Sequence, residues 1–138
     1  MALTGRFHPL LVHFPIALVL IAAVAELVSL TTPFPEWHRV AVANIRAGAA
    51  FAVASVGAGW VLASSRIVEA SAALEWHRWV GLVTALTAVT AALATGEIDR
   101  SPRRLWLYRI ALFLAAGLVG VAGHLGAVLV WGADFLHP

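Results

Sequence analysis

Four long runs of apolar residues divide the chain, over residues 9–30, 40–63, 76–95 and 105–131. At about 1.5 Å per residue, an α-helix of each length crosses the roughly 30 Å hydrocarbon core of a bilayer. The fourth run has length left over for tilt or for a protruding end. The pattern therefore predicts an all-α fold, an integral membrane bundle of four helices.

Polar connections between these runs are short, which favours an up-down bundle in which successive helices are neighbours. The connections are TTPFPEWHR (31–39), a link over 64–75 and GEIDRSPRR (96–104). No room is left for a second domain, so we expect one transmembrane domain over residues 1–138. Tryptophans occur near the predicted helix ends, as an interfacial aromatic belt requires; they are Trp37, Trp60, Trp76, Trp79, Trp106 and Trp131.

Composition supports the membrane assignment and narrows the chemistry. Hydrophobic residues make up 62% of the chain and charged residues 12%, too little polar surface to cover a soluble core. All nine basic residues are arginines, against seven acids, so a net charge of +2 favours lipid headgroups over nucleic acid. Cysteine is absent, which excludes disulfides, thiolate metal sites and covalently attached c-type haem.

An even number of spans places both chain termini at one end of the bundle, here called the histidine end; the other is the arginine end. Three arginines fall at the histidine end, Arg6, Arg66 and Arg78. Six fall at the arginine end, Arg39, Arg46, Arg100, Arg103, Arg104 and Arg109. Because cytoplasmic loops carry excess positive charge, we expect the arginine end to be cytoplasmic and the histidine end periplasmic, in a multi-pass protein of the bacterial inner membrane.

Histidines gather at the end that carries the termini. His8 and His13 open the first helix, His77 opens the third, and His124 lies about two turns before the end of the fourth. His137 is in the C-terminal tail, and His38 alone is at the arginine end. Polar rings in a hydrocarbon setting are costly, so a cluster of four from three helices predicts a function.

Small residues follow these histidines along their helix faces. Gly81, Thr84, Ala85 and Ala88 follow His77, and Gly120 and Gly117 precede His124. Such a face permits close helix packing, and it also leaves room for a flat macrocycle whose iron the histidines ligate. In the first helix, Pro15 lacks the N–H that the carbonyl of Leu11 would accept, so a bend is expected there.

Haem b, one or two groups, is the preferred cofactor, because two imidazoles on facing helices and a dry slot suffice to hold it. His13 and His124 are the preferred axial pair, since they are the deepest of the four. His8 and His77 would then bind a second haem or the propionates. Copper or zinc is the alternative cofactor, with Glu75 completing an imidazole shell. Proton handling and plain interfacial chemistry are further interpretations of the cluster.

Three charged residues lie within the runs toward the arginine end. Glu26 is about a turn from the end of the first helix, and Arg46 and Arg109 lie at similar depth in the second and fourth. An unpaired charge there is expensive, so we expect a structural ion pair between Glu26 and an arginine. A proton-entry or quinone-headgroup role is the alternative.

Three stretches, HPLLVHFPIAL, EWHRWVG and GHLGAVLVWG, resemble the bacterial family called domain of unknown function 2231, small predicted four-helix membrane proteins. The resemblance covers nearly the whole chain and implies a redox setting outside the cytoplasm, because members are often encoded with or fused to c-type cytochromes. By this resemblance, the histidines of the family correspond to His8, His13, His77 and His124, and not to His38 or His137. Ala127 stands where the family usually has a second glycine.

The sequence thus predicts a haem b protein that passes electrons, as a small subunit between a quinol or dehydrogenase and a periplasmic c-type cytochrome, within a larger redox complex. Two alternatives stay open: a copper or zinc membrane protein, and a non-redox structural or assembly subunit. An enzyme acting alone is the weakest interpretation, because no nucleophile or carboxylate pair has suggestive spacing.

Overall fold

The computed structural model describes residues 5–65, 69–96 and 101–135, and its regular elements there are all helical. In chain order they are α2 (His8–Leu11), α3 (His13–Thr31), α4 (Glu36–Ala63), α5 (Ala72–Ala94) and α6 (Pro102–Trp131). Within the described ranges, four helical spans are long and apolar enough to cross a membrane, with α2 and α3 together forming the first. The prediction of an all-helical membrane bundle is confirmed.

Three of the helices begin three or four residues earlier than their apolar runs: α4 at Glu36, α5 at Ala72 and α6 at Pro102. First turns are polar because their N–H groups need partners, so hydropathy underestimates them. At the start of α5 the Ser71 hydroxyl oxygen accepts the N–H of Leu74 at 3.1 Å. Pro102 occupies the first turn of α6, where its missing N–H costs nothing.

The first span is interrupted at Val12, between α2 and α3. Val12 donates its N–H to the carbonyl of His8 at 3.0 Å, and Ile16 donates to Val12 at 3.3 Å. Pro15 has no N–H for the carbonyl of Leu11, which explains why the helix breaks one turn before this proline. α2 packs on α4 as well as on α3.

Small residues fill the interior of the bundle, so the helices approach closely. The buried core includes Ala22, Ala49, Ala88, Ala91 and Ala115, with Val19, Ile45 and Leu112 as its larger members. A Cβ added at Gly48 would lie 3.1 Å from Cγ2 of Val19, so α3 and α4 are in tight contact at this point.

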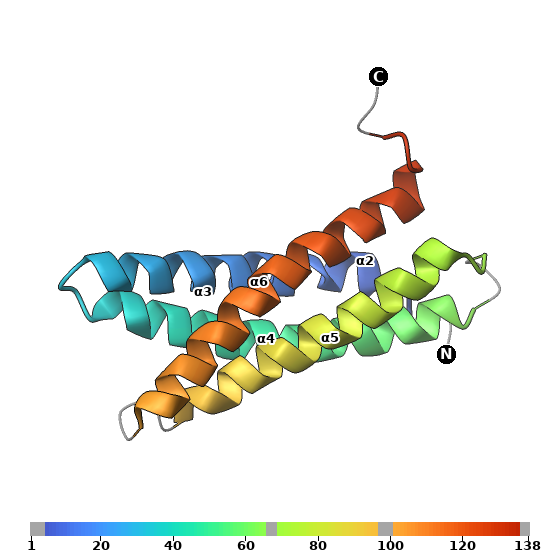
Figure 1. The fold of residues 1–138 in the computed structure, drawn as a ribbon. Helices are drawn as coiled ribbons and strands as arrows, with labels where there is room; N and C mark the ends of the chain where they lie inside the picture. The colour runs from blue at the N-terminus through green and yellow to red at the C-terminus, as the bar shows by residue number, and fades with distance from the viewer. Residues whose placement is uncertain (1–4, 66–68, 97–100, 136–138) are drawn as a thin grey trace.

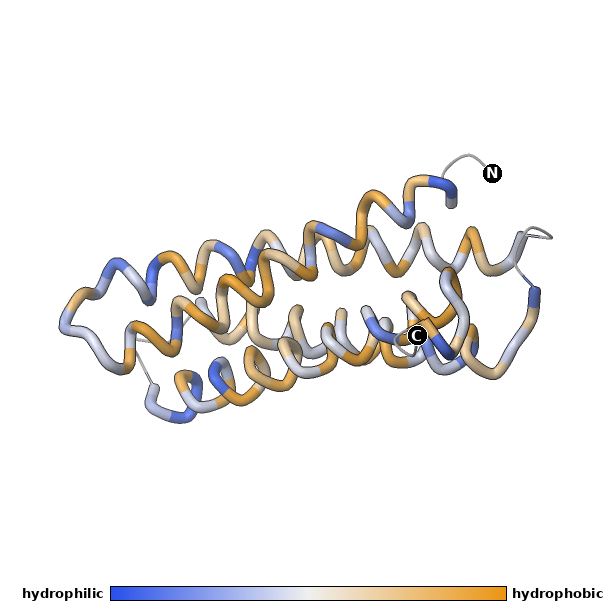
Figure 2. Tube along the Cα trace, turned by 90° about the horizontal axis from the view of Figure 1, so that it is seen from above, coloured by the Kyte–Doolittle hydropathy of each residue, from blue (hydrophilic) through white to orange (hydrophobic). Residues whose placement is uncertain are grey.

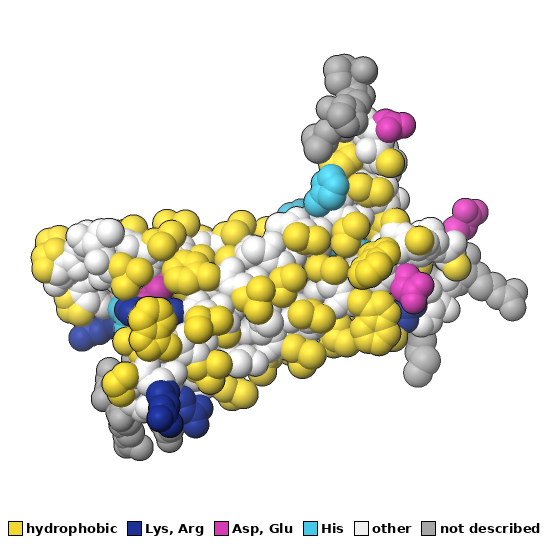
Figure 3. Space-filling view, viewed as in Figure 1, with side chains coloured by type: hydrophobic (Ala, Val, Ile, Leu, Met, Phe, Trp, Pro, Cys, Tyr) yellow, Lys and Arg dark blue, Asp and Glu magenta, His cyan; other side chains and the backbone are white. Residues whose placement is uncertain are grey.

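Large apolar side chains face outward instead, as they do where the solvent is lipid. Leu93 and Val130 are each 72% exposed. Figure 2 shows hydrophobic residues along all the helices, and Figure 3 shows an outer face that they dominate. The basic side chains visible in Figure 3 gather mostly at the end where α6 begins.

The helices are joined in an up-down order, and each packs on its sequence neighbour, with α3 also touching α6. Figure 1 shows that α2 begins and α6 ends at the same end of the bundle. Figure 1 also shows α6 tilted away from the other helices toward that end. This divergence leaves the histidine end less tightly packed than the arginine end.

Candidate functional site

A cavity of about 570 Å³ opens at the histidine end. Helices α2, α4, α5 and the second half of α6 all contribute to its wall, which is mostly apolar. Its lining includes the polar residues His8, His13, Ser55, His77, Arg78 and Thr84. The volume falls within the range of ordinary ligand sites, and an apolar pocket with a few convergent polar groups is the usual form of such a site.

His8 reaches this cavity from α2. Its ring Nδ1 lies 2.8 Å from the carbonyl oxygen of Ser55 on α4. Because a carbonyl only accepts, Nδ1 carries the hydrogen and Nε2 keeps its lone pair. The ring lies against Gly59, where an added Cβ would come within 2.8 Å of Cε1 of His8. A larger residue at position 59 would occupy the space that the His8 imidazole fills.

His77 is held in the same way from α5. Its Nδ1–H donates to the carbonyl of Ala122 on α6 at 3.1 Å. A Cβ at Gly126 would approach Cε1 of His77 to 3.3 Å, so this ring also lies against a glycine. Both histidines therefore carry the same tautomer and keep Nε2 as an available ligand atom, the arrangement in which histidine binds metal.

The rings of His8 and His77 lie near one another, with their planes almost perpendicular. Their centroids are 6.2 Å apart and their planes are inclined by 79°. Metal–imidazole bonds are about 2 Å long, which puts two ring centres roughly 6 Å apart when the bonds are collinear and roughly 5 Å apart at a tetrahedral angle. The distance between the ring centres of His8 and His77 is therefore close to that of two collinear imidazole ligands.

Arg78 and Ser55 bring unpartnered polar atoms to the same cavity. Nε of Arg78 and Oγ of Ser55 are buried without a hydrogen-bond partner among the described residues. The guanidinium of Arg78 lies 4.0 Å above the ring of Trp60, a cation–π contact that fixes its position. Buried polar atoms are nearly always satisfied in proteins, so these two atoms are candidates to contact a polar group of a ligand.

The other two predicted site histidines lie differently. His13 lines the cavity but is exposed at its edge. His124 is exposed and does not line the cavity, and its ring lies 5.9 Å from that of Phe135. The structure therefore brings together His8 and His77 rather than His13 and His124. Depth along a helix did not reveal this, because the break at Val12 and the tilt of α6 decide which rings meet.

The alternative with a metal ion in an imidazole shell needs a third ligand nearby. Glu75 is exposed and outside the cavity lining. Over residues 5–65, 69–96 and 101–135, no three His, Cys, Asp or Glu side chains form a group suited to a metal ion. His137 lies outside the described residues.

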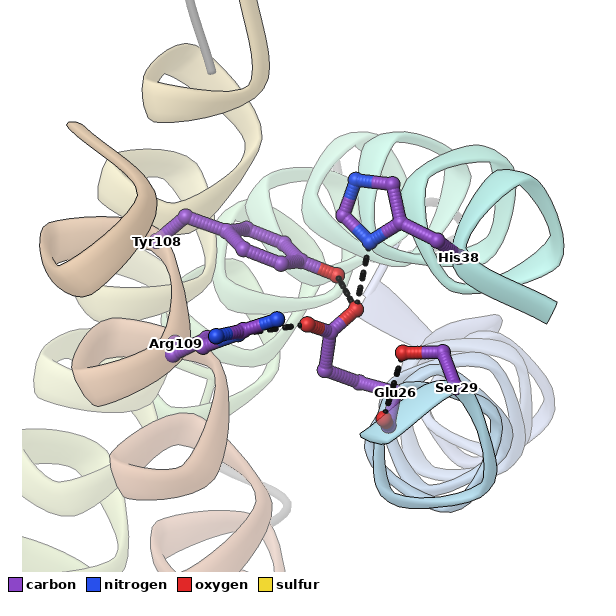
Figure 4. A network of polar contacts seen from close by, with 5 residues as sticks. All are labelled: Glu26, Ser29, His38, Tyr108 and Arg109. Atoms are coloured by element: carbon purple, nitrogen blue, oxygen red, sulfur yellow. Dashed lines mark hydrogen bonds and ion pairs between the residues drawn. The ribbon is translucent and has the colours of Figure 1, made fainter. Parts of the chain in front are cut away.

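Glu26 is the centre of a polar network at the arginine end, shown in Figure 4. This carboxylate is 0% exposed. Its Oε1 accepts Nε of Arg109 at 2.7 Å, while Oε2 accepts Nδ1–H of His38 at 2.7 Å and the hydroxyl of Tyr108 at 3.1 Å. The ion pair joins α3 to α6, and His38 adds α4.

Of the two arginines expected near Glu26, Arg109 is the partner. Arg46 instead donates from Nε to Oγ1 of Thr95 at 2.8 Å, which joins α4 to the end of α5. Sequence reasoning missed His38 and Tyr108 as partners of Glu26. A buried carboxylate needs several donors, and Tyr108, the neighbour of Arg109 and the chain's single tyrosine, was an available signal.

Comparison with protein-family models matches residues 6–135 to a family described as "Predicted membrane protein (DUF2231)". The comparisons with curated proteins and with solved structures give no match. The matched range contains every helix described above.

Proposed function

We propose that this chain, which belongs to the DUF2231 family of predicted membrane proteins, binds haem b between His8 and His77 and passes electrons at the histidine end. The observation that carries the proposal is the pair of rings, 6.2 Å apart, each oriented through Nδ1 so that Nε2 stays available. Bound haem would supply one-electron redox chemistry within the span, where the side chains offer none.

The residues of the cavity suit haem better than a lone metal ion. Two opposed imidazoles are the whole protein ligand set that haem iron requires, because the macrocycle provides the rest. Apolar walls suit the porphyrin faces, and the buried Nε of Arg78 offers a partner for a propionate carboxylate. Copper and zinc sites usually use three or four protein ligands.

Each contact in the cavity has a definite role in this function. The carbonyls of Ser55 and Ala122 hold the two imidazoles in one tautomer and make Nε2 a stronger donor to a metal. Gly59 and Gly126 let those rings stand close to α4 and α6.

A site at the histidine end also suggests the partners. The arginine distribution favours a position of this end outside the cytoplasm, in a bacterial inner membrane. The protein would thus be a small subunit that receives electrons from a quinol or dehydrogenase and delivers them to a periplasmic c-type cytochrome. A structural or assembly subunit without a cofactor is the competing function.

A reduced-minus-oxidised spectrum of the detergent-purified protein, with metal analysis, tests the proposal. We expect iron and the sharp α band of low-spin bis-histidine haem. His8→Ala and His77→Ala should each abolish this band, because each removes one axial ligand, while His38→Asn at the other end should leave it unchanged.

Other results would contradict this assignment. A band lost in His13→Ala and His124→Ala but kept in His8→Ala and His77→Ala would restore the pair predicted from depth. About half the pigment lost in every single variant would indicate two haems. Copper or zinc without haem would replace the cofactor, and no metal at all would favour the structural subunit.

A further inference from the structure

A second cavity, of about 330 Å³, lies at the arginine end beside the Glu26 network. It is formed by the connection from α3 to α4 together with the first two turns of α6, and its lining includes Pro33, Phe34, Leu105, His38 and Arg109. Glu26 itself is five residues from the end of α3, roughly 8 Å along the helix axis. The cavity therefore lies near one boundary of the membrane span.

His38 lines this cavity and also contacts Glu26. Its Nδ1–H donates to the carboxylate of Glu26, which leaves Nε2 outside this bond, and Figure 4 shows Nε2 on the ring edge away from Glu26. A buried carboxylate behind an imidazole fixes its tautomer and stabilises the charge that follows proton uptake at the other nitrogen.

The remaining polar groups of this cavity favour a hydroxyl group as the ligand. The hydroxyls of Ser29 and Thr32 donate to the carbonyls of Glu26 and Val28, so toward the cavity they offer only lone pairs. Nε of Arg109 is used by Glu26, which leaves its terminal NH₂ groups. The cavity thus combines several acceptors with one cationic donor, and a hydroxyl both donates and accepts.

We propose that this cavity binds the headgroup of a membrane hydroquinone, with one ring hydroxyl donating to Nε2 of His38 and its oxygen near the guanidinium of Arg109. The apolar walls from Pro33, Phe34 and Leu105 suit a flat ring, and a lipid-soluble ligand reaches the membrane boundary by lateral diffusion. This site is at the opposite end from His8 and His77 and does not rest on haem binding.

The test is a titration of the protein in lipid nanodiscs with decyl-ubiquinol under anaerobic conditions. Its dimethyl ether, which keeps the ring and loses both hydroxyl hydrogens, and decyl phosphate are the comparison probes. We expect the ether to bind about tenfold more weakly than the hydroquinone, the change that one lost hydrogen bond produces. Decyl phosphate should bind more weakly still, because most polar groups of the cavity are acceptors.

His38→Asn is the decisive variant. The Asn side-chain nitrogen can take the place of Nδ1 and keep the bond to Glu26, while no atom replaces Nε2, so the fold is kept and the acceptor is lost. We expect about tenfold weaker binding of decyl-ubiquinol, with unchanged helix content and thermal midpoint. His124→Ala, an exposed histidine outside both cavities, is the matched control and should bind like the unmodified protein.

Three results would overturn the hydroquinone site: equal affinity in His38→Asn, equal affinity for the ether, or tighter binding of decyl phosphate, which would make this a lipid-headgroup site. The haem spectrum of each variant separates the two proposals. If decyl-ubiquinol does not bind but the α band is intact, only the hydroquinone site is rejected. If the protein contains no haem but still binds decyl-ubiquinol through His38, only the haem site is rejected.

Discussion

Both ends of the bundle place polar side chains inside a span that faces lipid, and they satisfy those side chains differently. At the arginine end, both oxygens of Glu26 have partners, and three helices meet there. At the histidine end, the rings of His8 and His77 use one nitrogen each, and Arg78 and Ser55 keep buried atoms without partners among the described residues. The satisfied Glu26 carboxylate serves stability, while the buried atoms without partners at the histidine end are available to a ligand.

Glu26→Ala should give the largest effect, and it acts on the Glu26 network. The substitution leaves Arg109, Tyr108 and His38 without their shared acceptor inside the bundle, a loss of about 3–5 kcal/mol for breaking a buried ion pair. Chemical denaturation in detergent micelles measures it. Cofactor binding per folded molecule should be unchanged, because His8 lies on the order of 25 Å away along the helix. Pigment lost from well-folded Glu26→Ala protein would show that the two ends are coupled.

Gly59→Ala tests the position of His8 at the histidine end. The new Cβ would meet Cε1 of His8 at 2.8 Å, so the imidazole must move and its bond to Ser55 is lost. We expect overpacking to cost about 1–3 kcal/mol and the cofactor to be bound poorly or not at all. Gly57→Ala, two residues away with nothing within 4 Å of its Cβ, is the control. Equal behaviour of the two variants would mean that the place of His8 is not set by Gly59.

A pair of smaller substitutions compares a satisfied hydroxyl with an unsatisfied one. Tyr108→Phe removes one of the donors to Glu26 and should destabilise by about 1 kcal/mol. Ser55→Ala removes a buried oxygen that has no partner among the described residues, so it should leave the stability of the cofactor-free protein unchanged or raise it by up to about 1 kcal/mol. Thermal melts followed by circular dichroism measure both. A larger loss for Ser55→Ala than for Tyr108→Phe would contradict the contrast between the ends.

Sequence reasoning found the helices because four apolar runs of membrane length permit little else. It placed their starts too late, since the first turns of α4 and α6 are polar, and α5 begins directly after its capping residue Ser71. The number of spans also brought His8 and His77 to one end. Their pairing could not be read from the sequence, because it depends on the break at Val12 and on bonds to backbone carbonyls.

The arginine end shows the same limit. A buried charge is costly, so the sequence predicts an arginine partner for Glu26. Arg109 was one of two candidates. Hydropathy cannot tell which of Arg46 and Arg109 points inward, because the rotation of each helix is set by packing of small residues on all sides. His38 was placed at this end but not joined to Glu26, since its ring comes from the polar first turn of α4.

The tilt of α6 links the larger cavity to the thickness of the bilayer. A helix of 30 residues is about 45 Å long, well beyond a hydrocarbon core of roughly 30 Å, so α6 can match the membrane by inclining. The second half of this inclined helix forms one wall of the cavity. A thicker bilayer favours a more upright α6 and a narrower opening, whereas a thinner one widens it. Acyl-chain length in reconstituted membranes is thus a physical variable that acts on ligand access without any change in the chain.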